Sequence, residues 1–259
     1  MSSDRQPLTY EGMEQGELPS CLDAHWNPKG NRCLRYVSTA LTMLDAKIAS
    51  NDLLMSVAPL RLVTVGGCLA VRLCHNREAS YDIDCLLDPH VTAVEDYSAE
   101  FELVIQDVAH EGGFYKDWLN QQVKIFVSRK RRVTFFIESV QQDIVVYSGK
   151  NLVVYAGRLD WALESKVRRV SHSRSRRGHK NVDLPDAAAL IHLMRKDGDG
   201  LPISFQYIRD LNLNGFDLQP TEEALREIAE YYFNEYGEIG LAEMVWDNDT
   251  EKWKVVDSG

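Results

Sequence analysis

Two aspartates in an apolar stretch constrain the fold of this chain more than any other feature. Residues 63–87 read VTVGGCLAVRLCHNREASYDIDCLL, so a β-branched run leads into Gly66 and Gly67, and Asp82 and Asp84 open a second apolar run. Aspartate is depleted in strands and costly to bury without a partner. Since strand side chains alternate, Asp82 and Asp84 are expected on one face. That face is then expected either to be exposed to solvent or to have a positively charged partner beside it.

Each half of this pattern has two interpretations. A Gly-Gly turn between a strand and a helix exposes backbone N–H groups and allows close approach of a phosphate, but it is also an ordinary turn. Two carboxylates at i and i+2 can share a Mg²⁺ ion, which prefers oxygen ligands, but they can also form a solvated strand end. Their order and spacing in one stretch favour the two functional interpretations together.

The remaining pattern predicts a mixed α/β N-terminal half and an α-helical C-terminal half. Strands are expected in residues 60–65, 81–88, 143–148 and 151–157, with further strand signals around the basic turn in 123–140. Helices are expected in residues 35–55, 68–75 and 91–110, the last ending at Gly112-Gly113. The composition changes near residue 157. Helical patterns then follow in residues 158–170, 184–196 and 220–237, with Thr221 as the N-cap of the last helix.

The segments VGGCLAVRL and SYDIDCLL together resemble the signature of the nucleotidyltransferase superfold, which is a Gly-Gly or Gly-Ser turn, a short helix and a D-x-D strand. The closer resemblance is to its AbiEii-like, toxin-type branch. RLDWALESKVRRV followed by KNVDLPDAAAL is similar to that branch's lysine-bearing helix and its D-x-x-D helix start. The family usually has an arginine two residues before its Ser/Thr, where this chain has Glu78.

This resemblance implies an α+β fold, a nucleotidyltransferase-like mixed β-sheet with flanking helices and a helical C-terminal region. Its parts are an extended arm in 1–30, an α/β domain in 31–157 and the helical region in 158–259. The implied activity is Mg²⁺-dependent transfer of a nucleotidyl group from a nucleoside triphosphate to an acceptor, tRNA or a small molecule. The implied metal ligands are Asp82, Asp84 and Glu138, the last taken as a strand residue.

The resemblance also implies a substrate-binding set. Gly66, Gly67 and Ser80 match the phosphate-binding turn, and Lys166 matches the nucleotide-phosphate lysine, with a catalytic role. The set is completed by Arg168, Arg169, Asp183 and Asp186. Arg168 is nevertheless expected to face solvent, because it lies about half a helical turn from Lys166.

Charge and cysteine content bound the partners. The formal net charge of −10 excludes a generic nucleic-acid coat, since non-specific phosphate binding needs a basic surface. Residues 166–180, with seven Lys/Arg and no acid, are the local exception, and they form either a mobile solvated segment or a contact for tRNA or another RNA. Five cysteines without C-x-x-C spacing indicate reduced core residues in a cytoplasmic protein without a zinc site. No membrane partner is expected, and the oligomeric state is open.

Two further functions compete with nucleotidyl transfer. On the same scaffold, a tRNA-dependent transferase could form an amide from aminoacyl-tRNA, with the carboxylates acting as acid or base. A non-catalytic descendant could bind nucleotide alone. The pair Asp82 and Asp84 speaks against that last function, because paired acids on an apolar strand lower stability unless something binds them.

Overall fold

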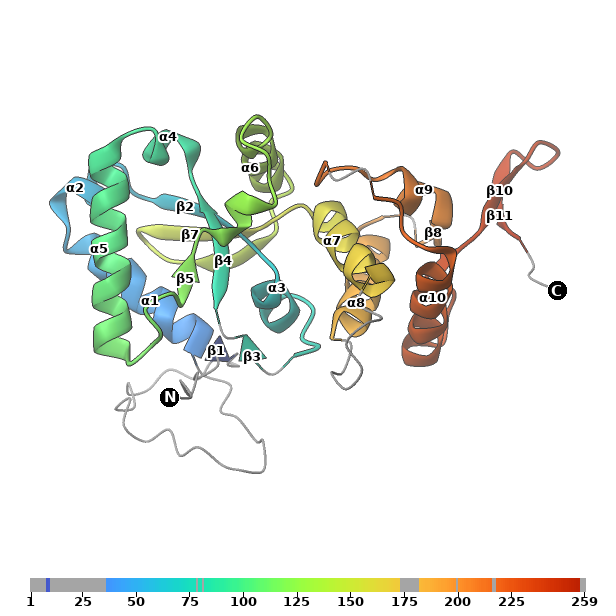
Figure 1. Ribbon diagram of the computed structural model, residues 1–259, viewed down its shortest axis with the longest axis horizontal. Coiled ribbons are helices and arrows are strands. Elements are labelled where there is room, and N and C mark those ends of the chain that lie inside the picture. The colour runs from blue at the N-terminus through green and yellow to red at the C-terminus, as the bar shows by residue number, and fades with distance from the viewer. Residues whose placement is uncertain are drawn as a thin grey trace, which may run out of the picture. The chain divides into compact units, whose positions relative to one another are not determined.

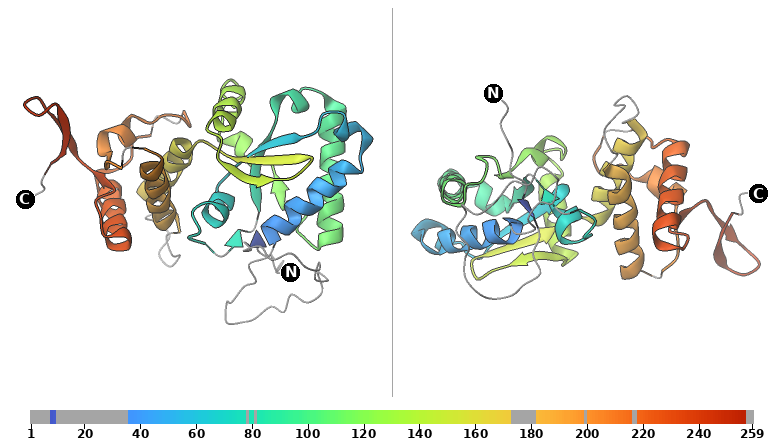
Figure 2. Two further views of the ribbon diagram at one scale, coloured as in Figure 1. Left: turned by 180° about the vertical axis from the view of Figure 1, so that it is seen from behind. Right: turned by 90° about the horizontal axis from the view of Figure 1, so that it is seen from below.

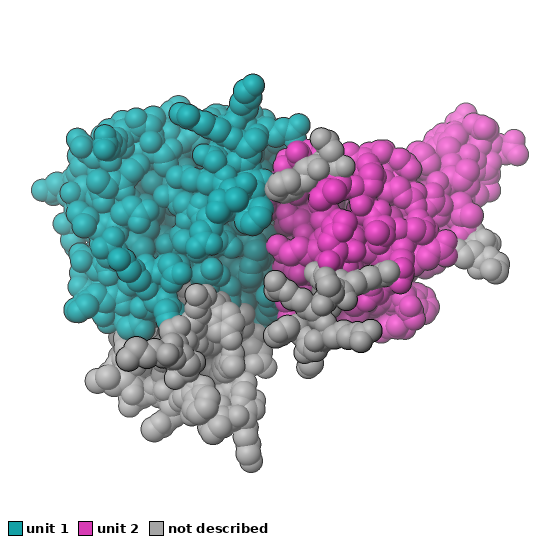
Figure 3. All heavy atoms as spheres, in the orientation of Figure 1, with its two compact units in different colours: residues 1–158 teal, residues 159–259 magenta. Residues whose placement is uncertain are grey.

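A five-stranded sheet forms the centre of the first part of the chain in the computed structural model (Figure 1). The structure describes residues 8–9, 36–77, 79–80, 82–172, 182–198, 200–215 and 218–256. The chain divides into two compact units, unit 1 (residues 1–158) and unit 2 (residues 159–259), coloured separately in Figure 3. The composition change seen in the sequence lies next to this division. Each unit is described by itself below.

The sheet of unit 1 has the strand order β5-β4-β2-β7-β6 and is mixed. β2 pairs antiparallel with β4 and parallel with β7, β4 pairs parallel with β5, and β6 pairs antiparallel with β7. A two-stranded pair, β1 with β3, lies outside it. The strands are β1 (Leu8–Thr9), β2 (Leu60–Val65), β3 (Ala79–Ser80), β4 (Ile83–Leu87), β5 (Leu119–Asn120), β6 (Val145–Ser148) and β7 (Leu152–Ala156).

Helices flank this sheet. α1 packs against α5 and β7, and α6 packs against β2 and β7. The apolar positions of α1 that repeat at helical spacing, Leu41, Leu44 and Ile48, are fully buried. The helical segments are α1 (Tyr36–Ala49), α2 (Asp52–Met55), α3 (Gly67–Arg72), α4 (Pro89–Thr92), α5 (Glu95–Gly112), the 3₁₀ helix η1 (Gln122–Ile125) and α6 (Arg132–Gln141). The predicted mixed sheet with flanking helices is therefore present.

One predicted element of unit 1 is wrong. The strand signals in residues 123–140 belong to η1 and α6 instead. The segment is rich in Val, Ile and Phe, which favour strands. The buried positions of α6, however, are Phe135, Phe136 and Ser139, which share one face of the helix. Burial of this face against the sheet overrides the local strand preference.

Unit 2 contains the expected helices and additional strands. α7, α8 and α10 pack against one another, and Thr221 caps α10 through the N–H of Ala224 as predicted. The prediction of a helical C-terminal region is incomplete, because this region also contains strands: β8 pairs with β9, and β10 pairs with β11. The elements are α7 (Leu159–His172), α8 (Asp183–Asp197), β8 (Ile203–Ser204), α9 (Phe205–Asp210), α10 (Glu222–Tyr236), β9 (Leu241–Ala242), β10 (Met244–Asp247) and β11 (Lys252–Val255).

The hairpin β10–β11 projects from the helices of unit 2 in both views of Figure 2.

Across the described part of the chain, no helix combines the length and the apolar character needed to cross a membrane. Of the predicted N-terminal arm, the structure describes only β1.

Candidate functional site

The turn from β2 into α3 is shaped by two glycines. Gly66 has φ 72° and ψ −138°, a backbone conformation that residues with a β-carbon rarely adopt. A β-carbon on Gly66 would lie 3.3 Å from Oδ2 of Asp84. A β-carbon on Gly67 would lie only 2.3 Å from Oγ of Ser80. Gly66 is thus favoured by its backbone conformation, and Gly67 by the Ser80 hydroxyl that occupies the space beside it.

Ser80 is buried against this turn. Its side chain is only 6% exposed, and its hydroxyl donates a hydrogen bond of 2.8 Å to the backbone carbonyl of Asp82. This bond fixes the chain just before β4. Ser80 thus connects the Gly-Gly turn with the segment that carries both aspartates.

Asp82, Asp84 and Asn120 lie on one side of the sheet. Asp84 is the register partner of Val65 in β2 and of Asn120 in β5, and partner residues share a side. Nδ2 of Asn120 donates to Oδ2 of Asp82 at 3.4 Å. Asp82 precedes β4 rather than lying within it. The structure therefore brings the two predicted carboxylates together and adds an amide.

Asn120 was not found from the sequence. It follows the buried residues Trp118 and Leu119, and together with Leu119 it forms the strand β5, whose two residues are too few for a recognisable alternating pattern. Its one signal is a polar residue directly after an apolar pair. Its Oδ1 accepts a hydrogen bond from the backbone N–H of Gln122, which begins η1.

The thiols near this site are buried in the core. Burial raises the pKa of Cys68 to about 11, and the pKa of Cys85 is raised further by burial and by Asp84. Both thiols are therefore protonated at neutral pH, so they are not thiolate ligands or nucleophiles in this environment. The prediction of reduced core cysteines holds for these two positions.

Glu138 lies in a different environment from the one predicted. It is a residue of helix α6 rather than of a strand, and its carboxylate forms a 2.5 Å ion pair with Arg158. α6 does cover the side of the sheet that carries Asp84, since Phe135 and Val65 both approach Gly157. Nevertheless, in the described parts of the chain, no three His, Cys, Asp or Glu side chains form a group that could hold a metal ion.

The predicted residues of unit 2 form a buried charge cluster. Lys166 on α7 is 5% exposed and pairs with Asp183 at 2.9 Å and with Asp186, both in the first turn of α8. Arg169 also contacts Asp183, at 3.1 Å. Burial alone would raise the pKa of Asp183, but Lys166 and Arg169 outweigh this effect and lower it. The cluster links α7 to α8.

Arg168 does not face solvent, so that expectation is wrong. It is 8% exposed and forms a 2.5 Å ion pair with Glu164, one turn earlier on α7. The Glu164 carboxylate also accepts the backbone N–H groups of Leu213 and Asn214, while burial raises its pKa. A turn between helices covers this face of α7, which the sequence of α7 alone does not reveal. Residues 173–181, the rest of the predicted basic segment, lie outside the described residues.

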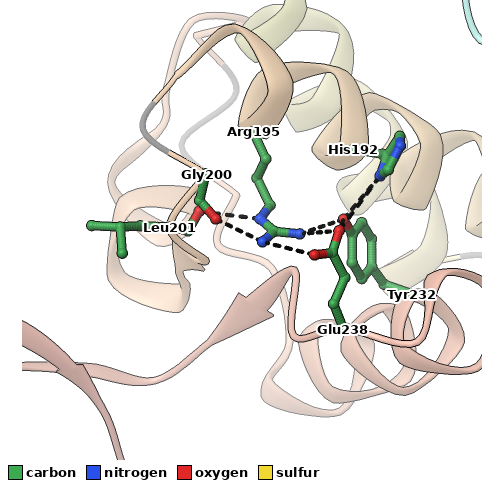
Figure 4. Close-up of polar contacts among 6 residues, drawn as sticks. All are labelled: His192, Arg195, Gly200, Leu201, Tyr232 and Glu238. Atoms are coloured by element: carbon green, nitrogen blue, oxygen red, sulfur yellow. Dashed lines mark hydrogen bonds and ion pairs between the residues drawn. The ribbon is translucent and has the colours of Figure 1, made fainter.

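A second polar cluster of unit 2, which the sequence did not predict, surrounds Tyr232 (Figure 4). The buried hydroxyl of Tyr232 on α10 contacts Arg195 at 2.6 Å, Glu238 at 3.0 Å and Nδ1 of His192 at 3.0 Å. Arg195 also donates to the carbonyls of Gly200 and Leu201. Every contact of this cluster joins α8 to α10 or to a neighbouring turn, which is a structural role.

The predicted site residues therefore fall into two groups. Unit 1 carries Gly66, Gly67, Ser80, Asp82 and Asp84 together, whereas unit 2 carries Lys166, Arg169, Asp183 and Asp186 together. No family model matches this chain, and comparison with the curated proteins and with the solved structures gave no match either.

Proposed function

We propose that this protein is a Mg²⁺-dependent nucleotidyltransferase that transfers a nucleotidyl group from a nucleoside triphosphate to tRNA or to a small molecule. One observation carries the proposal. A β-carbon on Gly66 would lie 3.3 Å from Asp84, and one on Gly67 would lie 2.3 Å from the Ser80 hydroxyl, so both side chains pack directly against the Gly-Gly turn. The pattern that resembled the superfold in sequence is thus a contiguous group in space.

The roles follow from the chemistry of each group. Backbone N–H groups of Gly66 and Gly67 and the hydroxyl of Ser80 would bind phosphate oxygens. Asp82 and Asp84, with the amide oxygen of Asn120 nearby, supply the hard oxygen donors that suit Mg²⁺. Bound Mg²⁺ would neutralise the triphosphate and lower the pKa of the attacking hydroxyl. Asn120 holds the carboxylate of Asp82 through its amide nitrogen.

Among the basic residues of α7, the geometry favours Arg169 as the anion-binding group. Its side chain is 50% exposed, against 7% for Lys166 and 9% for Arg168. Lys166 would have to leave two carboxylates to bind a phosphate. Within unit 2, Arg169 is therefore the basic residue of α7 most available to an anion, while Lys166 pairs with Asp183 and Asp186.

A second candidate, a non-catalytic nucleotide-binding protein, is favoured by the position of Glu138. Within the described residues, the ion pair with Arg158 and the location in a helix separate this carboxylate from the pair Asp82 and Asp84. Two carboxylates would then bind Mg²⁺ and nucleotide without completing a transfer site.

Transfer and binding can be measured separately. The purified protein is incubated with each α-labelled nucleoside triphosphate, Mg²⁺, and either total tRNA or a pool of small-molecule hydroxyl compounds. Label transfer is followed by gel and by mass spectrometry. We expect transfer by the wild type, and a loss of at least about a hundredfold in Asp84→Asn, because one preorganised charged group is removed.

The matched control is Asp143→Asn, an exposed aspartate of unit 1 that should leave transfer unchanged. Thermal shift with nucleotide, with and without Mg²⁺, reports binding alone. Binding without transfer to any acceptor would select the non-catalytic function. The absence of both binding and transfer would contradict both functions.

A further inference from the structure

Residues 118–137 of unit 1 are basic, although the protein as a whole is acidic. The structure describes every residue of this stretch. Asp and Glu account for 39 of the 259 residues, so a stretch of twenty would hold about three. This stretch holds none. It contains five basic residues instead, at Lys124, Arg129, Lys130, Arg131 and Arg132. At physiological salt, charges beyond about 8 Å are screened, so a local surface acts independently of the net charge.

Four large apolar side chains are exposed in the same stretch. Ile125 is 77% exposed, Phe126 50%, Val133 49% and Ile137 46%. Val133 and Ile137 are one turn apart and therefore lie on one face of α6. Isolated exposed apolar residues are common, whereas a group rimmed by basic side chains indicates an interaction site. We call these four residues, with Arg129, Lys130 and Arg131, the α6 surface.

Hydrogen bonds of the Arg132 side chain fix the segment that carries the α6 surface. Arg132 donates from Nε to the carbonyl of Val127 at 3.0 Å and from Nη2 to that of Lys124 at 2.6 Å. These bonds tie η1 to α6. Burial, reinforced by Arg132, lowers the pKa of Lys124. Lys124 and Arg132 thus serve the internal structure, while Arg129, Lys130 and Arg131 are exposed.

A comparison with α7 indicates the class of partner. The apolar residues next to the basic residues of α7 are Val167 and Val170, and both are buried. A ligand at the basic residues of α7 would therefore not contact these two valines. Phosphates of RNA would form ion pairs with the basic side chains but would leave Ile125, Val133 and Ile137 exposed to water. An anionic bilayer would bind both the basic and the apolar side chains, because its headgroups attract cations and its acyl boundary takes up apolar side chains.

We propose that the α6 surface binds the surface of an anionic membrane. The basic side chains contact lipid phosphates and carboxylates, and Ile125, Phe126, Val133 and Ile137 insert at the headgroup boundary. Figure 1 shows α6 outside the sheet of unit 1, and the side chains of the α6 surface are exposed. The sequence-based expectation of no membrane partner considered spanning segments, and surface binding needs none.

Co-sedimentation of the full-length protein with lipid vesicles tests this proposal. One set of vesicles is phosphatidylcholine alone, and the other mixes phosphatidylcholine with phosphatidylserine. We expect binding to the mixed vesicles at low salt, and little to the neutral ones. The variant Arg129→Gln/Lys130→Gln should bind about thirtyfold more weakly, since each basic residue contributes about fivefold near an anionic surface. Ile125→Ser/Phe126→Ser should lose at least about tenfold.

Matched controls change the same residue types elsewhere in unit 1. Leu103→Ser on α5 replaces a side chain that is 54% exposed, and Lys150→Gln removes an exposed charge. Both should bind vesicles like the wild type, and thermal melts should show that all variants fold. Absence of binding to mixed vesicles, equal binding to neutral ones, or equal losses in the controls would overturn the proposal.

A labelled single-stranded oligoribonucleotide provides the competing probe. If RNA binds, is lost in Arg129→Gln/Lys130→Gln and is retained in Ile125→Ser/Phe126→Ser, while vesicles do not bind, then the surface contacts nucleic acid and the membrane proposal is wrong. The vesicle result stands independently of nucleotidyl transfer, because Asp84→Asn should bind vesicles normally.

Discussion

The Gly66-Gly67 turn of unit 1 and the Lys166 cluster of unit 2 hold polar groups in place by different means. In the turn, Ser80 and Asp84 occupy the space that a β-carbon would fill, so the arrangement depends on volume and backbone dihedral angles. In the cluster, Lys166 is buried between Asp183 and Asp186, so the arrangement depends on charge. Adding one methyl group should disturb the first, whereas removing one charge should disturb the second.

This difference separates a binding geometry from a stabilising one. A site shaped by glycines keeps backbone N–H groups accessible to a ligand. A buried ion pair instead satisfies its charges internally, and removal of one member leaves the other in a medium of low polarity. The two groups of predicted residues should therefore respond differently to mutation, and each of the following experiments tests that contrast.

The largest expected effect is that of Lys166→Met. Asp186 is 1% exposed and would lose its cationic partner, so unit 2 should be destabilised by about 3–5 kcal/mol. Hydrogen exchange with peptide mass spectrometry measures this in α7 and α8 specifically. Lys196→Met, at an exposed position of α8, is the matched control and should change little.

A compensating substitution sharpens this experiment. The double variant Lys166→Met/Asp186→Leu removes both charges and should recover most of the lost stability, since apolar residues replace buried ion pairs well. If Lys166→Met leaves exchange in α7 and α8 unchanged, charge does not hold the cluster. The role of Lys166 as a phosphate ligand would then gain support.

The next effect is that of Gly66→Ala in unit 1. Gly66 has φ 72° and ψ −138°, and a β-carbon would also lie 3.3 Å from Asp84. We expect a loss of about 3 kcal/mol, the upper end for a residue held in such a region. Gly113→Ala is the control, since Gly113 has φ 65° with nothing within 4 Å of a β-carbon. It should lose only about 1 kcal/mol. Denaturant titration compares the two, and equal losses would mean that contact with Asp84 does not matter.

The sequence predicted the glycine-shaped site better than the charge-held one, for a physical reason. Gly66, Gly67, Ser80, Asp82 and Asp84 lie within twenty residues, and their arrangement follows from the neighbouring strands β2 and β4 with α3 between them. Burial of Lys166 depends on α8, and burial of Arg168 depends on residues 211–214, which are distant in sequence. The position of Arg168 half a helical turn from Lys166 therefore predicted a solvent-facing side chain, whereas packing buries it.

The same reasoning explains the errors in the fold. Glu138 was placed on a strand because Val, Thr and Phe around it favour strands, whereas contact of Phe135 and Phe136 with the sheet selects a helix. Asn120 belongs to a strand of two residues, whose position is set by pairing with β4. Long periodic helices such as α7 and α10 needed no such context, since their apolar spacing is sufficient.

A smaller effect is expected for Gly67→Ala. A β-carbon here would lie 2.3 Å from the Ser80 hydroxyl, which can turn away at the loss of its bond to Asp82. The expected loss is about 1 kcal/mol, the contribution of one hydrogen bond. In a Ser80→Ala background the same substitution should destabilise less, which a double-mutant cycle measures. Additive effects would show that Gly67 and Ser80 do not share this space.

The smallest expected effect is the pH dependence contributed by Asp183. Lys166 and Arg169 lower its pKa below the ordinary value of 3.8, but burial opposes them, so the net shift is limited. At a pH above about 5, this carboxylate is almost fully ionised in both states and its stabilisation is complete. As the pH falls through 3.8, the unfolded chain binds the proton first, so the free energy of unfolding decreases until the folded pKa is passed.

Hydrogen exchange in α7 and α8 at decreasing pH should therefore show less acid sensitivity in Asp183→Asn than in the wild type. Asp210→Asn is the control, because Asp210 accepts a hydrogen bond from Gln206 rather than from a cation. Equal acid sensitivity in Asp183→Asn and the wild type would mean that Lys166 and Arg169 do not stabilise the ionised carboxylate. Charge would then contribute less to unit 2 than its geometry indicates.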